Sequence, residues 1–174
     1  MKYLVKFFVV TFFLLICTHT FAEQRIVVLD LTYVLNESKA GKGAQEFLTK
    51  TFNDNVKKFS GIEKALKEDE KDLFAKKNIL SKEEYGKKMN SLRKRNIDYQ
   101  TERRASIDKI TMQRAEARET LLKKLEPILE SYIKENSVSL VVDKKYILGG
   151  SPGFEITKVI VEQLNKDLPS LNLK

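Results

Sequence analysis

The chain of 174 residues has no tryptophan, one cysteine (Cys17) and one histidine (His19). Both of these single residues lie within the first 22 positions, a segment that we expect to be removed. The mature chain would then have no thiol and no imidazole, which excludes cysteine and histidine nucleophiles, histidine general bases and Cys/His zinc sites. It could form no disulfide either, so its stability must come from packing and association.

The first 22 residues have the three parts of a secretory signal peptide. Lys2 and Lys6 give a positive start, residues 7–17 contain one polar side chain other than the final cysteine, and Thr20-Phe21-Ala22 is a small-residue cleavage site. The apolar core is short for a bilayer span, although an uncleaved anchor is the alternative. We therefore predict export of the chain and cleavage after Ala22.

Positive charge exceeds negative charge, with 32 Lys and Arg against 24 Asp and Glu and a net charge of +8. Loss of Lys2 and Lys6 would leave 30 basic and 24 acidic residues, a net charge of +6. The excess is concentrated between Gly86 and Arg104, in a basic arm patch of Lys87, Lys88, Arg93, Lys94, Arg95, Arg103 and Arg104. This patch could attract acidic proteins or anionic lipid, bind nucleic acid, or be a solvated face. Export argues against nucleic acid as the physiological ligand.

A thin apolar stripe runs through the charged residues from about Ala44 to Tyr132. Its first half repeats every seven residues, at Phe52, Phe59, Leu66, Leu73 and Leu80. This spacing is typical of a helix that packs along one narrow line. The stretch from Ser81 to Glu84 then has the pattern of a capping box, which begins a new helix. We predict helices over about 44–79 and 82–135, joined near Ser81 into an antiparallel hairpin.

Shorter apolar segments flank the hairpin on both sides. Residues 25–30 and 138–143 are predicted as buried strands, with a further strand possible over 146–148 and short helices over 31–35 and 155–165. Residues 40–43, with two glycines, are expected to be a flexible join to the first long helix. Pro127 should kink the second long helix or remove one of its hydrogen bonds.

These end segments total about 50 residues, which is little for an independent core. Their strands lack clean alternation, which indicates cover on both faces. We therefore predict an α+β fold in which several copies share a β body made of residues 23–43 and 136–174, while residues 44–135 form a projecting arm. The oligomer core would contain Ile26, Val27, Val28, Leu29, Leu140, Val141 and Val142.

The arm is the candidate binding surface. Its seam is poor in apolar residues near the tip, so the helices should bend and splay there. Apolar side chains scattered among charges suit weak, multivalent contact with an unfolded chain, although ordinary hairpin packing is the alternative role. The candidate contacts are Phe47, Phe52, Phe59, Phe74, Met89, Tyr99 and Met112.

Catalysis has little support in the sequence. Asp30 and Asp143 each follow an apolar strand, so a carboxylate pair at the strand ends is conceivable. No phosphate-binding glycine loop and no ligands at metal spacing accompany them. We expect both aspartates to be solvated or capping residues at the strand ends, and we expect no enzymatic activity, metal or cofactor.

Several segments together resemble a known family. They are the opening residues 25–31, the stretch 34–42 with its Ser38-Lys-Ala-Gly-Lys42 motif, the returning strand 139–143 and the start of the last helix at Glu155. In these the chain resembles, over essentially its whole mature length, the Skp/OmpH family of periplasmic chaperones of Gram-negative bacteria.

The resemblance implies a homotrimer with a small β body and three helical arms around a cavity. It implies an ATP-independent holdase that receives unfolded outer-membrane proteins in the periplasm and prevents their aggregation. A lipopolysaccharide contact, proposed for some members, could correspond here only to the basic arm patch. A structural coiled-coil spacer or adaptor of the periplasm is the alternative function.

Overall fold

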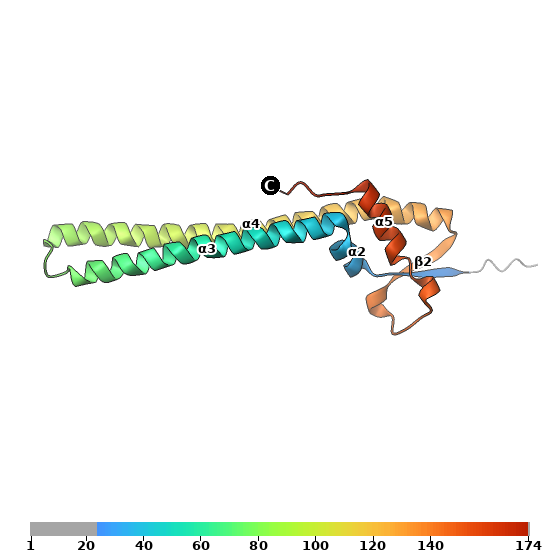
Figure 1. The fold of residues 1–174 in the computed structure, drawn as a ribbon, viewed down its shortest axis with the longest axis horizontal. Coiled ribbons are helices and arrows are strands. Elements are labelled where there is room, and N and C mark those ends of the chain that lie inside the picture. Colours follow the sequence, from blue (N-terminus) through green and yellow to red (C-terminus); the bar gives the residue numbers. More distant parts are fainter. Residues whose placement is uncertain (1–23, 174) are drawn as a thin grey trace, which may run out of the picture.

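The computed structural model describes residues 24–173, so the predicted signal peptide lies outside the described residues. The chain forms a long two-helix arm with a small mixed body at one end (Figure 1). Its elements are β1 (Arg25–Leu29), α2 (Leu31–Glu37), α3 (Lys39–Ala75), α4 (Lys82–Glu135), β2 (Val138–Asp143) and α5 (Thr157–Asp167), with 3₁₀ turns at Lys144–Tyr146 and Pro152–Phe154. The predicted α+β class, with a helical hairpin inserted between two strands, is confirmed.

The arm is an antiparallel pair of α3 and α4 whose turn lies where the capping box predicts it. The backbone N–H of Glu84 donates to the Ser81 hydroxyl (3.3 Å), and the Glu84 carboxylate accepts from the Ser81 backbone N–H (3.2 Å). Helix α4 therefore begins at Lys82 and runs through Pro127 to Glu135. Proline has no N–H to donate, so one helical hydrogen bond is absent at that position.

The seam contains only part of the seven-residue repeat. Phe59, Leu66 and Leu73 are buried, whereas Phe52 is half exposed. A straight helix drifts about 20° per heptad, so a strict seven-residue repeat leaves the contact line after a few turns. Leu48 and Ala44 take over the buried positions nearer the body.

Helix α3 begins at Lys39, five residues before the predicted start, and the predicted flexible join at 40–43 is wrong. The Ser38 hydroxyl accepts from the backbone N–H of Gly41 (3.2 Å) and caps the helix. Gly41 is buried, and a Cβ on it would collide with the backbone carbonyl of Leu35 in α2. Glycine is needed here for the close approach of α2 and α3, not for flexibility.

The sheet consists of β1 and β2, paired in parallel, with Ile26 opposite Leu140 and Leu29 opposite Asp143. The helical arm is the long crossover that a parallel pair requires. The possible strand at 146–148 is not formed: that stretch begins within a 3₁₀ turn. Instead, Ile156 donates its backbone N–H to Val28 (2.9 Å), beside an isolated bridge between Val28 and Glu155.

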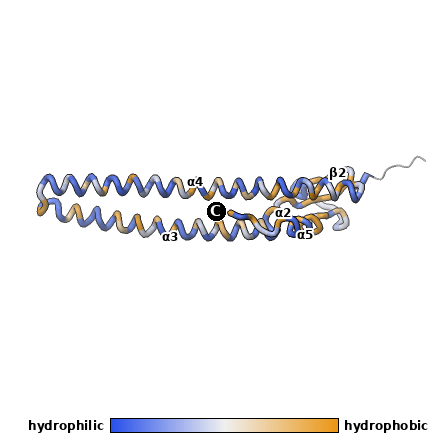
Figure 2. The backbone as a smooth tube through the Cα atoms, turned by 90° about the horizontal axis from the view of Figure 1, so that it is seen from above, coloured by the Kyte–Doolittle hydropathy of each residue, from blue (hydrophilic) through white to orange (hydrophobic). Residues whose placement is uncertain are grey.

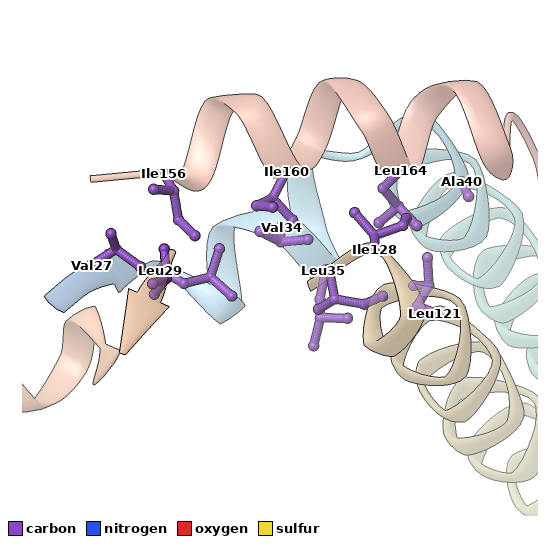
Figure 3. Close-up of a cluster of buried hydrophobic side chains, with 12 residues drawn as sticks. Val27, Leu29, Val34, Leu35, Ala40, Leu121, Ile128, Ile156, Ile160 and Leu164 are labelled. Atoms are coloured by element: carbon purple, nitrogen blue, oxygen red, sulfur yellow. The ribbon is translucent and has the colours of Figure 1, made fainter. Parts of the chain in front are cut away.

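The core lies between the strands, α2, α5 and the base of α4 (Figure 3). Leu125 and Ile128 pack there, as the sequence predicts for the apolar base of this helix, whereas Leu121 lies beside Ala44 and Leu48 of α3, because α3 begins earlier than predicted. Val34, Ile160 and Leu164 are almost fully buried at its centre.

None of the helices within residues 24–173 is both long and apolar enough to cross a membrane.

Candidate functional site

The register of the arm is fixed by contacts between α3 and α4. Lys58 pairs with Glu102 (3.2 Å), Asp69 pairs with Arg95, and the rings of Phe59 and Tyr99 meet edge to face with centroids 6.0 Å apart. The two ion pairs are exposed, so each contributes little to stability. The arm is held chiefly by its narrow apolar seam.

The predicted contact residues do not gather in one place. Phe59 is buried in the seam against Tyr99, and Phe47, Met89 and Tyr99 itself are half buried. Phe52, Phe74 and Met112 are exposed, at 51%, 73% and 62%. Figure 2 shows hydrophobic residues interspersed along the arm and concentrated in the body. The arm therefore presents dispersed apolar contacts rather than a single pocket.

One groove on the outer half of the arm does combine several predicted residues. This upper groove, of about 720 Å³, is lined by Met89 and Tyr99 together with Arg93 and Arg103 of the basic arm patch. Leu66, Leu92 and Ile97 add apolar surface to it. Leu66 belongs to the seven-residue repeat, but only the packed hairpin shows that Leu66 and Leu92 line one groove with the two arginines. The groove can accept an apolar side chain and an acidic group at the same time.

Charge in the upper groove is mixed. The Lys67 ammonium donates to the Glu63 carboxylate (2.7 Å), and this hydrogen bond lowers the pKa of Glu63 and raises the pKa of Lys67. The Tyr99 hydroxyl also donates to Glu63, at a long 3.5 Å. Glu63 is therefore ionised and already partnered, and the remaining charges that line the groove are the Glu70 carboxylate and the two arginines.

The basic arm patch is not one uniform surface. Lys87 is neutralised by Glu83 (2.7 Å) and Arg95 by Asp69, while Arg93 and Arg103 line the upper groove. Lys88 and Arg95 line a smaller groove elsewhere along the two helices. Lys94 and Arg104 are exposed and have no ion pair within residues 24–173. Unneutralised charge is thus spread around the outer arm.

The predicted oligomer-core residues divide into two sets. Val27 and Leu29 fill the core of the single copy, while Ile26 and Leu140 are 43% and 53% exposed, and Val28, Val141 and Val142 are half buried. The predicted cover on both faces of the sheet is therefore absent from the single copy. Its open part continues into a body groove of about 670 Å³, in which Leu31, Leu122, Leu129, Ile133 and Val141 are apolar lining residues.

The two strand-end aspartates have local roles. Asp30 accepts from the backbone N–H of Tyr33 (2.8 Å) and caps α2. Asp143 accepts from the backbone N–H of Lys145 (3.3 Å), and its hydrogen bond to the Lys145 ammonium raises the pKa of that lysine. No group of acidic or metal-ligating side chains within residues 24–173 is arranged to hold a metal ion. The predicted capping role is confirmed.

Comparison with known proteins agrees with this architecture. A Skp-like protein of Pseudomonas aeruginosa is 24% identical over 170 residues, which cover 95% of this chain and 99% of the relative. A solved structure from Caulobacter crescentus, described as a candidate OmpH-like outer membrane chaperone, superposes with a TM-score of 0.78 at 17% identity. The match covers 89% of this chain and 92% of that one, and it establishes the shared fold.

The family comparison covers most of the chain. The family described as outer membrane protein (OmpH-like) matches residues 25–164, from the first strand to the buried Leu164 of α5. The matched span contains the whole arm and both strands. The chain belongs to the OmpH-like family.

Proposed function

We propose that this chain is an ATP-independent holdase of the periplasm that binds unfolded outer-membrane proteins between helical arms and prevents their aggregation. The bound unfolded protein is called the client below. The observation that carries the proposal is the arm itself, because its apolar side chains are dispersed, partly exposed and interleaved with charge. The protein acts by binding alone, without enzymatic activity, metal or cofactor.

Client contacts on the arm are individually weak. Full burial of one apolar side chain contributes about 1.5–3 kcal/mol, and exposed residues such as Phe52, Phe74 and Met112 would each be covered only in part. When several arms act on one client, each later contact forms at a high effective concentration. The overall affinity for the client is therefore much higher than the affinity of any single contact. Shallow, dispersed contacts also accept clients of different sequence.

The multivalent arrangement requires several copies, and we propose a homotrimer joined through the body. The body groove and the exposed Ile26 and Leu140 support association, because apolar surface of this kind marks protein interfaces. The half-buried Val28, Val141 and Val142 would complete their burial between copies. The arms would then project from one shared body and enclose the client.

The basic arm patch adds long-range attraction. Its unneutralised side chains, such as Lys94 and Arg104, would draw acidic client segments or the surface of anionic lipid or lipopolysaccharide. Nucleic acid is not proposed as a physiological partner, because the function is placed outside the cytoplasm.

An aggregation assay tests the proposal directly. A denatured β-barrel membrane protein is diluted out of urea with and without the mature chain, and light scattering is followed in the absence of nucleotide. We expect less than one trimer per client to suppress scattering measurably and a trimer equivalent per client to abolish most of it. A structural spacer or adaptor would leave scattering unchanged, and that result would refute the holdase.

A further inference from the structure

An open notch lies where the arm meets the body. The elbow notch, of about 420 Å³, is surrounded by α2, α3 and α4. Its apolar floor is formed by Ala44, Leu48, Ala117 and Leu121, each at most 6% exposed. Two cations, Arg114 and Arg118 of α4, belong to its lining. The notch is distinct from the upper groove and from the body groove.

The walls of the notch are held firmly. Gly41, which also lines it, permits the tight approach of α2 and α3, and the side chain of Ser38 in the connecting segment is fully buried. Two of its lining residues are also joined, because the Gln45 side-chain amide donates to the Asn36 side-chain oxygen (2.8 Å) and ties α3 to α2. The hollow is therefore a fixed feature of the junction between three helices.

The two arginines are placed to bind one anionic group. They are four residues apart, so they project from the same face of α4, about 5–6 Å from one another at Cβ. Neither has a carboxylate within 4.0 Å in the described part of the chain, whereas Lys123 on the same helix pairs with Glu119 (2.6 Å). A guanidinium binds a carboxylate through two parallel hydrogen bonds, and this geometry favours a carboxylate partner.

An exposed apolar track leaves the notch along the same face of the arm. Phe52 and Val56 follow the floor residue Leu48 at steps of four and are 51% and 50% exposed. Ile107, 48% exposed, lies seven residues before Arg114 and so on the same face of α4. The pairing of Lys58 with Glu102 places residues near 108 level with Phe52. The track therefore combines side chains from both helices.

We propose that the elbow notch and this track hold an extended client segment in which apolar side chains flank an aspartate or glutamate. One apolar side chain would enter the notch above Leu48, the carboxylate would bind Arg114 and Arg118, and the next apolar residues would cover Phe52 and Ile107. An extended peptide suits the track because its alternate side chains point to one face. The inference rests on the proposed holdase function and adds a preferred client sequence to it.

Peptide binding tests the inference apart from aggregation. A fluorescein-labelled ten-residue peptide with leucines on both sides of one aspartate is compared by anisotropy with the same peptide carrying asparagine. A charge-assisted hydrogen-bond pair contributes about 1.5–3 kcal/mol, so we expect the wild type to prefer the aspartate peptide by about tenfold or more. The Arg114→Ala/Arg118→Ala variant should lose this preference.

Two further variants keep the result specific. Lys109→Ala/Lys124→Ala removes the same charge from exposed positions of α4 outside the notch and should retain the preference. Thr49→Phe places a ring into the notch from an exposed lining position. It should weaken the binding of both peptides without changing the charge of the notch. Circular dichroism and native mass confirm that each variant is folded and assembled.

The outcomes separate the inference from the holdase proposal. If the wild type suppresses aggregation but the arginine variant retains the peptide preference, the notch is not the site. If vesicles with 30% phosphatidylglycerol displace the peptide from the wild type and bind in place of it, a lipid headgroup is the occupant and the peptide proposal is wrong. Absence of aggregation suppression by the wild type would refute the holdase, whatever the peptides do.

Discussion

Replacement of Val141 by aspartate should separate the copies while each copy stays folded. Val141 is half buried at the open side of the sheet and lines the body groove. In an isolated copy the new carboxylate can still reach water, because Val141 packs against the edge of the core and is only half buried. In an assembled body the same carboxylate would be buried without a cation.

The size of the effect follows from two contributions. Loss of a buried valine side chain costs about 1.5–3 kcal/mol, and burial of an unpaired charge costs several kcal/mol more. A total of at least about 4 kcal/mol for each copy corresponds to a thousandfold weaker interface. The variant should therefore be monomeric at micromolar concentrations at which the wild type is trimeric.

Light scattering coupled to size-exclusion chromatography measures the mass of both proteins. Val159→Asp is the matched control, because Val159 is an apolar residue, 51% exposed, on α5 and outside the body groove. We expect the control to remain trimeric and the Val141 variant to elute as a folded monomer that no longer suppresses aggregation. A trimeric Val141→Asp protein, or an active monomer, would refute the reasoning on the body.

Three other perturbations have defined outcomes. Gly41→Ala should destabilise the protein by more than about 1 kcal/mol in urea unfolding because its Cβ meets the Leu35 carbonyl, whereas Gly43→Ala, with open space around it, should stabilise α3 by about 0.8 kcal/mol; equal effects would contradict the packing at α2. Hydrogen bonds from the Ser81 hydroxyl and backbone N–H lower the pKa of Glu84 from its ordinary 4.5, so this cap should stabilise the arm tip above pH 4.5 and be lost as the pH falls below that value. Protection factors for amide exchange at residues 82–86, which are corrected for the intrinsic pH dependence of exchange, should fall as the cap is lost. Ser81→Ala should make these protection factors lower and less dependent on pH, and wild-type protection factors that do not change in acid would contradict the role of the cap. Raising NaCl from 50 to 500 mM should weaken client capture at least severalfold, since salt screens exposed charges. Client capture that does not change with salt would contradict a role of the basic arm patch in client binding.

The sequence predicts the arm well because its signals are local. Ser81 and Glu84 form the capping box that their spacing indicates, and α4 begins and ends where the pattern places it. The buried Phe59, Leu66 and Leu73 also follow from periodicity alone. Phe52 does not, because the drift of a seven-residue repeat depends on how far the two helices remain straight.

Features that depend on contacts between distant segments could not be predicted in the same way. Gly41 suggests a flexible join in the sequence, and its packing role is visible only once α2 lies against α3. The same holds for the elbow notch, since Arg114 and Leu48 are far apart in the chain and meet only through the hairpin. The division of the strand residues into a buried and an open set likewise requires the position of α5.

Native mass spectrometry of the assembly with and without one denatured outer-membrane protein tests the central claim most directly. The account predicts a trimer of the mature chain alone and a complex of three copies with one unfolded client when that protein is added. A stable monomer that takes up no client would contradict both the shared body and the enclosing arms.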